Sequence, residues 1–127
     1  MSIPVKDVME ASKAMLQKQF YAIFTTPAGG IEPILARMEE HLAFQVSLER
    51  EGVLYAAGPM WTDDEQHWTG DGLVVVRAAS LAEAAAIARR DPMHESGARA
   101  FTVRPWMINE GTVTIRLDSS SQTFSIL

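Results

Sequence analysis

The chain has 127 residues, of which 47% are hydrophobic, and its formal net charge is −5. This length fits one ordinary domain, and the hydrophobic content is too high for a disordered chain. The arginines are scattered and form no basic face, which argues against nucleic-acid binding. The absence of cysteine excludes disulfides and thiolate chemistry. No apolar run approaches the roughly 20 residues that span a bilayer. We therefore expect a soluble, cytoplasmic protein that binds neither nucleic acid nor membranes.

The first half of the chain is predicted to hold an arm, a strand and a long helix. Residues 4–16 have apolar positions near helical spacing, which indicates a short amphipathic helix or an arm. Aromatic and β-branched residues predict a strand at 20–25, apolar on both faces. The clearest element is a helix at 31–51, whose inward face is traced at steps of three and four by Ile31, Ile34, Leu35, Met38, Leu42, Gln45 and Val46.

The second half of the chain is predicted to hold further strands and a second helix of the core. Residues 53–60 are predicted to form a strand that Gly58 and Pro59 break or bend, and residues 72–77 a strand covered on both faces. Ser80 and Glu83 form a capping box that begins a helix, and this helix stops at Asp91-Pro92. A fourth strand is expected at 100–106, and clean alternation over 112–117 predicts an appended, half-exposed strand.

The predicted order is βαββαβ, the ferredoxin-like α+β arrangement, with an extra C-terminal strand. We expect one domain with an N-terminal arm at 1–18, a core at 19–107 and a C-terminal extension at 108–127. Two helices would cover one face of the antiparallel sheet and leave an apolar face bare. The usual cover for such a face is a second copy of the same sheet, so we predict a homodimer or a higher homo-oligomer.

His41 is the best candidate for chemistry, because it lies on the inward stripe of the long helix. A half-buried histidine exchanges protons near neutral pH and is a natural general base. Spacing alone favours the plainer alternative, a histidine at the margin of the core that is satisfied by a carbonyl.

Asp91 is the candidate partner of His41. A carboxylate at the end of the second helix faces the negative end of the helix dipole, so it invites a partner. It either orients and stabilises a histidine or forms the turn before Pro92.

The other two histidines leave their roles open. His67 lies in an acidic loop, where solvation is favoured over metal binding. His94 either faces the same cleft as Asp91 or is exposed. No phosphate loop, nucleophile elbow, dinucleotide fingerprint or metal-ligand spacing is present, so we expect no cofactor and assign no metal.

The order and spacing of several short motifs resemble the YciI-related (YCII) family over about residues 19–107. In that family a helix carrying His-Leu leads through Glu-Gly-x-Leu into a strand with Ala-Gly-Pro, as it does here at residues 37–44 and 51–59. The motifs at 80–84, 90–93 and 103–106 match as well. The chain departs from the family in its N-terminal arm, in its extra strand and in Met93, where an aromatic residue is usual.

The resemblance implies a dimeric α+β barrel with a catalytic histidine and aspartate, which fall on His41 and Asp91. It also implies a cofactor-independent lyase or isomerase for a small cyclic or aromatic-derived molecule, such as a dehydrohalogenase or muconolactone isomerase. Gly58 and Pro59 would shape the substrate pocket, and Arg104 would hold an anionic oxygen or simply face solvent. The alternatives are a small-molecule binding or accessory protein without turnover and a cofactor-free monooxygenase.

Overall fold

The computed structural model describes all 127 residues and divides into two compact units. One unit is Gln19–Trp106, and the other combines Met1–Lys18 with Met107–Leu127.

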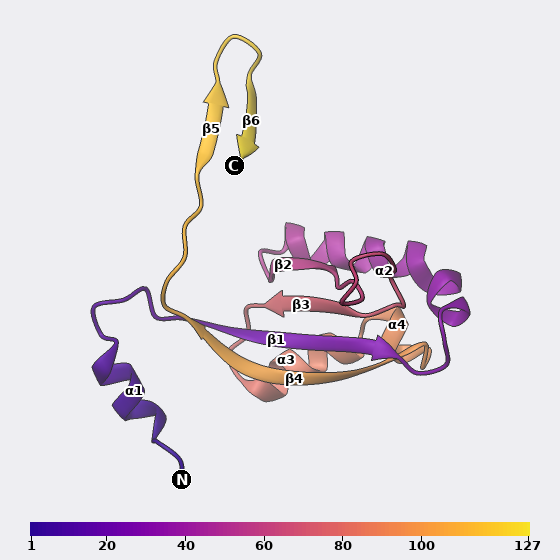
Figure 1. The fold of residues 1–127 in the computed structure, drawn as a ribbon, viewed down its shortest axis with the longest axis horizontal. Helices are drawn as coiled ribbons and strands as arrows, with labels where there is room; N and C mark the ends of the chain where they lie inside the picture. The colour runs from indigo at the N-terminus through magenta and orange to yellow at the C-terminus, as the bar shows by residue number, and fades with distance from the viewer. The chain divides into compact units, whose positions relative to one another are not determined.

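The larger unit is built on a four-stranded sheet with strand order β2-β3-β1-β4. Along the chain its elements are β1 (Lys18–Pro27), α2 (Glu32–Arg50), β2 (Leu54–Pro59), β3 (Gly72–Val76), α3 (Leu81–Arg89), α4 (Pro92–Glu95) and β4 (Arg99–Ile108) (Figure 1). β3 pairs antiparallel with both β1 and β2. This order of strands and helices is the predicted ferredoxin-like α+β fold.

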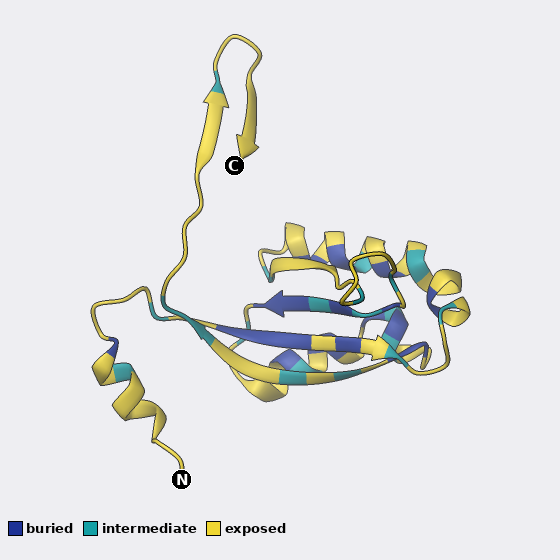
Figure 2. Cartoon of the chain, viewed as in Figure 1, coloured by how far each residue is buried: buried dark blue, intermediate teal, exposed yellow.

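The core lies between one face of this sheet and the helices. Figure 2 shows the buried residues concentrated along β1 and β3. Every second residue of these strands faces the helices, as strand geometry requires. The cluster consists of Tyr21 and Ile23 from β1, Val74 and Val76 from β3, Leu48 from α2, and Ala84, Ile87 and Ala88 from α3. Ser80 caps α3 by accepting a hydrogen bond from the Glu83 backbone N–H, as the capping box predicts.

The buried stripe of α2 differs from the predicted one. Leu35, Leu42 and Val46 are 58%, 54% and 42% exposed, so their placement in the core was wrong. The buried positions are Ile34, His41, Gln45 and Leu48. His41 and Gln45 are therefore buried on the inward face as predicted, whereas three apolar residues of the predicted face are exposed and the buried Leu48 was missed.

Two local predictions in the core unit were also wrong. The irregularity in β2 lies between Leu54 and Ala56, whereas Gly58 and Pro59 continue the regular pairing with β3. Pro59 is tolerated because β2 is an edge strand, where a missing N–H leaves no ladder bond unmade. The second helix is followed by a separate short helix, α4, that the prediction lacked.

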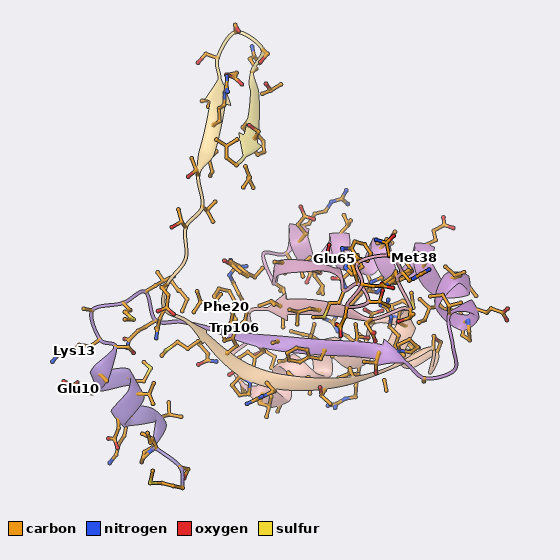
Figure 3. All side chains as sticks on the ribbon, viewed as in Figure 1. Glu10, Lys13, Phe20, Met38, Glu65 and Trp106 are labelled. Atoms are coloured by element: carbon orange, nitrogen blue, oxygen red, sulfur yellow. The ribbon has the colours of Figure 1, made fainter.

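The face of the sheet opposite the helices carries exposed aromatic side chains. Phe24, Tyr55 and Trp106 are 39%, 44% and 45% exposed. The rings of Phe20 and Tyr55 lie 4.4 Å apart, and the guanidinium of Arg77 lies 5.4 Å from each of them. Phe20 and Trp106 are labelled in Figure 3. We call Phe24, Tyr55 and Trp106 the open aromatic face.

The smaller unit contains α1 (Val5–Ala11) and a hairpin of β5 (Ile115–Asp118) and β6 (Thr123–Ile126). The helix falls within the predicted residues 4–16. The appended strand begins later than the predicted residue 112, and the prediction missed its partner β6. The loop between the strands includes Gln122 with a positive φ of 54°, a conformation that side-chain alternation does not report. No helix in the chain has the length and apolar character needed to cross a membrane.

Candidate active site

A cavity of about 690 Å³ lies in the larger unit. This volume is typical of small-molecule sites, which are mostly apolar and carry a few fixed polar groups. Gly58 and Pro59 lie in its wall, and Figure 3 labels Met38, which lines it from α2. The full lining is Thr25, Met38, His41, Leu42, Gln45, Glu49, Leu54, Tyr55, Ala56, Ala57, Gly58, Pro59, Trp61, Trp68, Gly72, Leu73, Val74 and Arg99.

His41 from α2 and Asp91 from the start of α4 form a buried pair at this cavity. His41 Nδ1 lies 2.9 Å from Asp91 Oδ1 and 2.8 Å from Oδ2. The two residues are 8% and 3% exposed. Because a carboxylate only accepts hydrogen bonds, Nδ1 carries the hydrogen, and Nε2 of the neutral ring is left with a free lone pair.

Asp91 is positioned by its role at the N-terminus of α4. Its Oδ1 accepts a hydrogen bond of 2.9 Å from the backbone N–H of Met93, and Pro92 occupies the first turn. The sequence placed this acid at the unfavourable end of α3. In the structure the same residue caps the favourable, positive end of the next helix. The cap and the bond to His41 together hold the carboxylate in one orientation.

Arg99 is a buried cation in the cavity wall. It is 6% exposed, its Nε donates to the Gly70 carbonyl at 3.0 Å, and its Cζ lies 5.9 Å from the centre of the Trp68 ring. Burial lowers the pKa of Arg99, while the more distant Asp91 and Asp71 raise it. Arg99 forms no ion pair, so the cavity contains a positive charge without a direct partner, an arrangement that suits an anionic ligand oxygen.

Arg104, the arginine chosen from the sequence for this task, does not line the cavity. It is exposed on β4, five positions beyond Arg99 and therefore on the other face of the strand. Arg99 shares its face with Phe101 and Val103, which pack against the core. This alternation was available in the sequence and would have favoured Arg99.

Gln45 is the other polar residue that the prediction missed as a site residue. It lies one turn from His41 on α2 and lines the cavity. Its Oε1 is buried without a hydrogen-bond partner. A buried polar atom without a partner costs about 1–3 kcal/mol, so its place in a cavity wall is explained if a ligand supplies the missing bond.

Neither of the other two histidines lines the cavity, but His94 contacts Thr25, which does. His94 Nδ1 is 2.6 Å from the Ala88 carbonyl, and Nε2 is 2.8 Å from Thr25 Oγ1. Burial lowers the pKa of His94, against smaller opposing effects of the Ala88 carbonyl and Asp91. The side chain of His67 is 74% exposed, as expected for the solvated loop. No group of three or more His, Asp or Glu side chains is arranged to hold a metal ion.

The sheet order and the one-sided helices define an α+β protein with a ferredoxin-like core. The family model of the YCII-related domain matches residues 19–107, and the chain belongs to this family, as its motifs indicated. No curated protein sequence matches the chain. A similar solved structure is 5-chloro-2-hydroxyhydroquinone dehydrochlorinase (TftG) from Burkholderia phenoliruptrix AC1100, in complex with 2,5-dihydroxybenzoquinone. It is 21% identical, its TM-score is 0.56, and the similarity covers 68% of this chain and 92% of that one. This likeness establishes the shared fold.

Proposed function

We propose that the protein is a cofactor-independent enzyme of the lyase or isomerase type, with the cavity as its active site. The observation that carries this proposal is the buried His41–Asp91 pair, which leaves His41 Nε2 as a free base at a cavity of about 690 Å³. A core histidine satisfied by packing alone would need neither a buried carboxylate nor a cavity beside it.

The chemistry begins with proton removal by His41. Nε2 takes a proton from a C–H or O–H group of the substrate, and the electron pair of that bond forms a new double bond. In a lyase a leaving group departs with its own bonding pair, and in an isomerase the proton returns at another atom. Asp91 stabilises the imidazolium that forms, and Arg99 stabilises negative charge on a substrate oxygen. A general base of this kind contributes about 10²–10⁴ in rate.

The substrate class is a small ring compound that carries oxygen substituents. The cavity walls include Leu42, Trp61 and Trp68, which suit a flat apolar ring, whereas Arg99 suits an ionised oxygen. The similar dehydrochlorinase acts on a chlorinated hydroxyhydroquinone and was captured with 2,5-dihydroxybenzoquinone. Both molecules belong to this class, which supports the same chemistry here.

The test is turnover of 5-chloro-2-hydroxyhydroquinone, followed as chloride release. We expect the wild-type chain to release chloride and His41→Gln to lose at least about 100-fold of the rate while it remains folded. An unchanged rate in His41→Gln would refute the base. Binding of 2,5-dihydroxybenzoquinone with no turnover would favour the binding protein, and oxygen consumption would favour the monooxygenase.

The active form is proposed to be a homodimer that covers the open aromatic face. Exposed rings of Phe24, Tyr55 and Trp106 lie on the sheet face that the helices leave uncovered. A second copy of the same face is the simplest complementary surface, because a two-fold interface is made of one patch used twice. Sedimentation should give twice the mass of 14.0 kDa for the wild type. Trp106→Glu should shift it to the monomer, whereas the exposed control Glu39→Lys should not.

A further inference from the structure

Thr25 and His94 form a hydrogen-bonded unit whose direction is fixed by the backbone. His94 Nδ1 lies 2.6 Å from the Ala88 carbonyl oxygen, which only accepts, so Nδ1 carries the hydrogen. In the neutral ring Nε2 then has no hydrogen and must accept. Thr25 Oγ1, 2.8 Å away, therefore donates its single hydrogen to Nε2.

This direction decides what Thr25 offers to the cavity that it lines. With its hydrogen committed to His94, the hydroxyl has only lone pairs left, so it can accept but cannot donate. Gly72 pairs with Thr25 across the sheet, and a Cβ added at Gly72 would lie 3.3 Å from Thr25 Cγ2. The missing side chain of Gly72 thus leaves the wall beside Thr25 free of a neighbouring group.

His94 is suited to hold this hydrogen and unsuited to take a proton from the substrate. The imidazole is packed against the Phe101 ring at 4.5 Å, and burial lowers its pKa. The charged or titratable groups that act on it are Asp91, Arg99 and His41. A ring that resists protonation stays an acceptor at neutral pH, so it acts on the ligand only through Thr25.

We propose that Thr25, oriented by His94 as a positioning residue, is a specificity-determining acceptor that selects ring substrates carrying a hydroxyl hydrogen in addition to the oxygen held by Arg99. This inference rests on the proposed function, because it assumes that the cavity binds the substrate. Arg99 only donates and Thr25 only accepts, so the two recognise opposite groups. Phenol has a single hydroxyl, which Arg99 holds, whereas a dihydroxybenzene offers the oxygen of one hydroxyl to Arg99 and the hydrogen of the other to Thr25.

The experiment compares the dissociation constants of phenol with those of catechol, resorcinol and hydroquinone on the full chain, by NMR titration. At neutral pH the wild type should bind at least one dihydroxybenzene about 5–10-fold more tightly than phenol, the value of one neutral hydrogen bond. Thr25→Val should abolish this preference, and Thr25→Ser should retain it. The matched control is Thr26→Val, because Thr26 is exposed on the same strand.

A pH series on the wild type tests the same inference without a substitution. When His94 is protonated, Nε2 becomes a donor, and the Thr25 hydroxyl must turn its hydrogen toward the ligand. The ratio of dissociation constants for the monomethyl ether of the preferred dihydroxybenzene and for that dihydroxybenzene itself should fall toward one as the pH is lowered, because a donating Thr25 bonds an ether oxygen and a hydroxyl oxygen alike. In His94→Leu the ratio should not depend on pH.

Several results overturn the inference, and they differ in what they leave of the proposed function. A preference that survives Thr25→Val, or a ratio that does not change with pH in the wild type, refutes the acceptor and leaves the proposed function standing. Equal binding of all four ligands, with chemical-shift changes at His41, also refutes the acceptor and leaves the proposed function standing. If none of the four binds, or if the shift changes avoid the cavity, both this inference and the proposed ring-substrate function fail.

Discussion

His41 and Asp91 are 50 positions apart in the chain, yet the histidine Nδ1 lies 2.8 Å from a carboxylate oxygen of the aspartate. The middle of α2 and the N-cap of α4 must pack together to make this contact. Asp91 has two roles at once: it caps α4 and fixes the tautomer of His41. Variants at this position can therefore separate catalysis from stability.

Asp91→Asn should lose activity while it keeps the fold. Asparagine caps helices as well as aspartate does, so α4 should form normally. The neutral amide cannot stabilise the imidazolium, so kcat should fall by at least about 100-fold. Asp91→Ala should lose the activity and should also be less stable, because the missing cap costs about 1 kcal/mol of unfolding free energy. Chloride release and thermal unfolding of the two variants measure the two effects, and an Asp91→Asn enzyme with full kcat would contradict the assigned role.

Gln45→Leu should stabilise the protein and weaken ligand binding. The change removes a buried carbonyl oxygen that lacks a partner and replaces it with an apolar group of similar size. We expect the free energy of unfolding to rise by about 1 kcal/mol and the affinity for 2,5-dihydroxybenzoquinone to fall. Urea denaturation and calorimetry provide the two readouts. Gln66→Leu, in the exposed loop, should change neither, and a destabilised Gln45→Leu would show that the amide has a structural role.

The fold was predictable because strands and helices are indicated by the local periodicity of the sequence. Clean runs at β1 and β3 and the capping box at Ser80 each specify an element without reference to distant residues. The same reasoning was right only in part for α2. It placed His41 and Gln45 on the inward stripe, where they are buried, but it also placed Leu35, Leu42 and Val46 there, and these are exposed. Which positions of the stripe are covered depends on the cavity beside it, and a cavity is a property of several elements together.

The site was predictable only in part, for a related reason. The family motifs pointed to His41 and Asp91, but the reason that Asp91 is well placed is α4, a helix of four residues too short to show periodicity. Arg99 was missed although strand alternation favoured it over Arg104. The link from Thr25 to His94 joins residues 69 positions apart, and no local pattern encodes such a contact.

Gly70→Ala should destabilise the larger unit and displace Arg99. Gly70 has a φ of +108°, and a Cβ there would lie 2.6 Å from Ile34 Cδ1 and 2.8 Å from Pro27 Cγ. Backbone strain and overpacking together should cost about 2–5 kcal/mol. Because the Gly70 carbonyl holds Arg99 Nε, ligand affinity should fall as well. Gly52→Ala is the matched control, since its φ is +73° with no atom within 4 Å of the added Cβ. Gly52→Ala should lose only the stability that backbone strain costs. Equal losses of unfolding free energy in the two variants would contradict the packing argument.

His94 should make the protein less stable as the pH falls below neutrality. Burial lowers the pKa of His94 in the folded chain from its ordinary value of 6.5. Between these two values the unfolded chain binds a proton that the folded chain does not, so the free energy of unfolding decreases as the pH falls through about 6.5 and levels off below the folded pKa. His94→Gln removes this contribution, so the difference in unfolding free energy between wild type and variant should shrink or reverse on acidification. His67→Gln, at an exposed histidine, should follow the wild type. A His94→Gln curve parallel to that of the wild type from pH 8 to pH 5 would mean that His94 takes up its proton equally in the folded and unfolded chains.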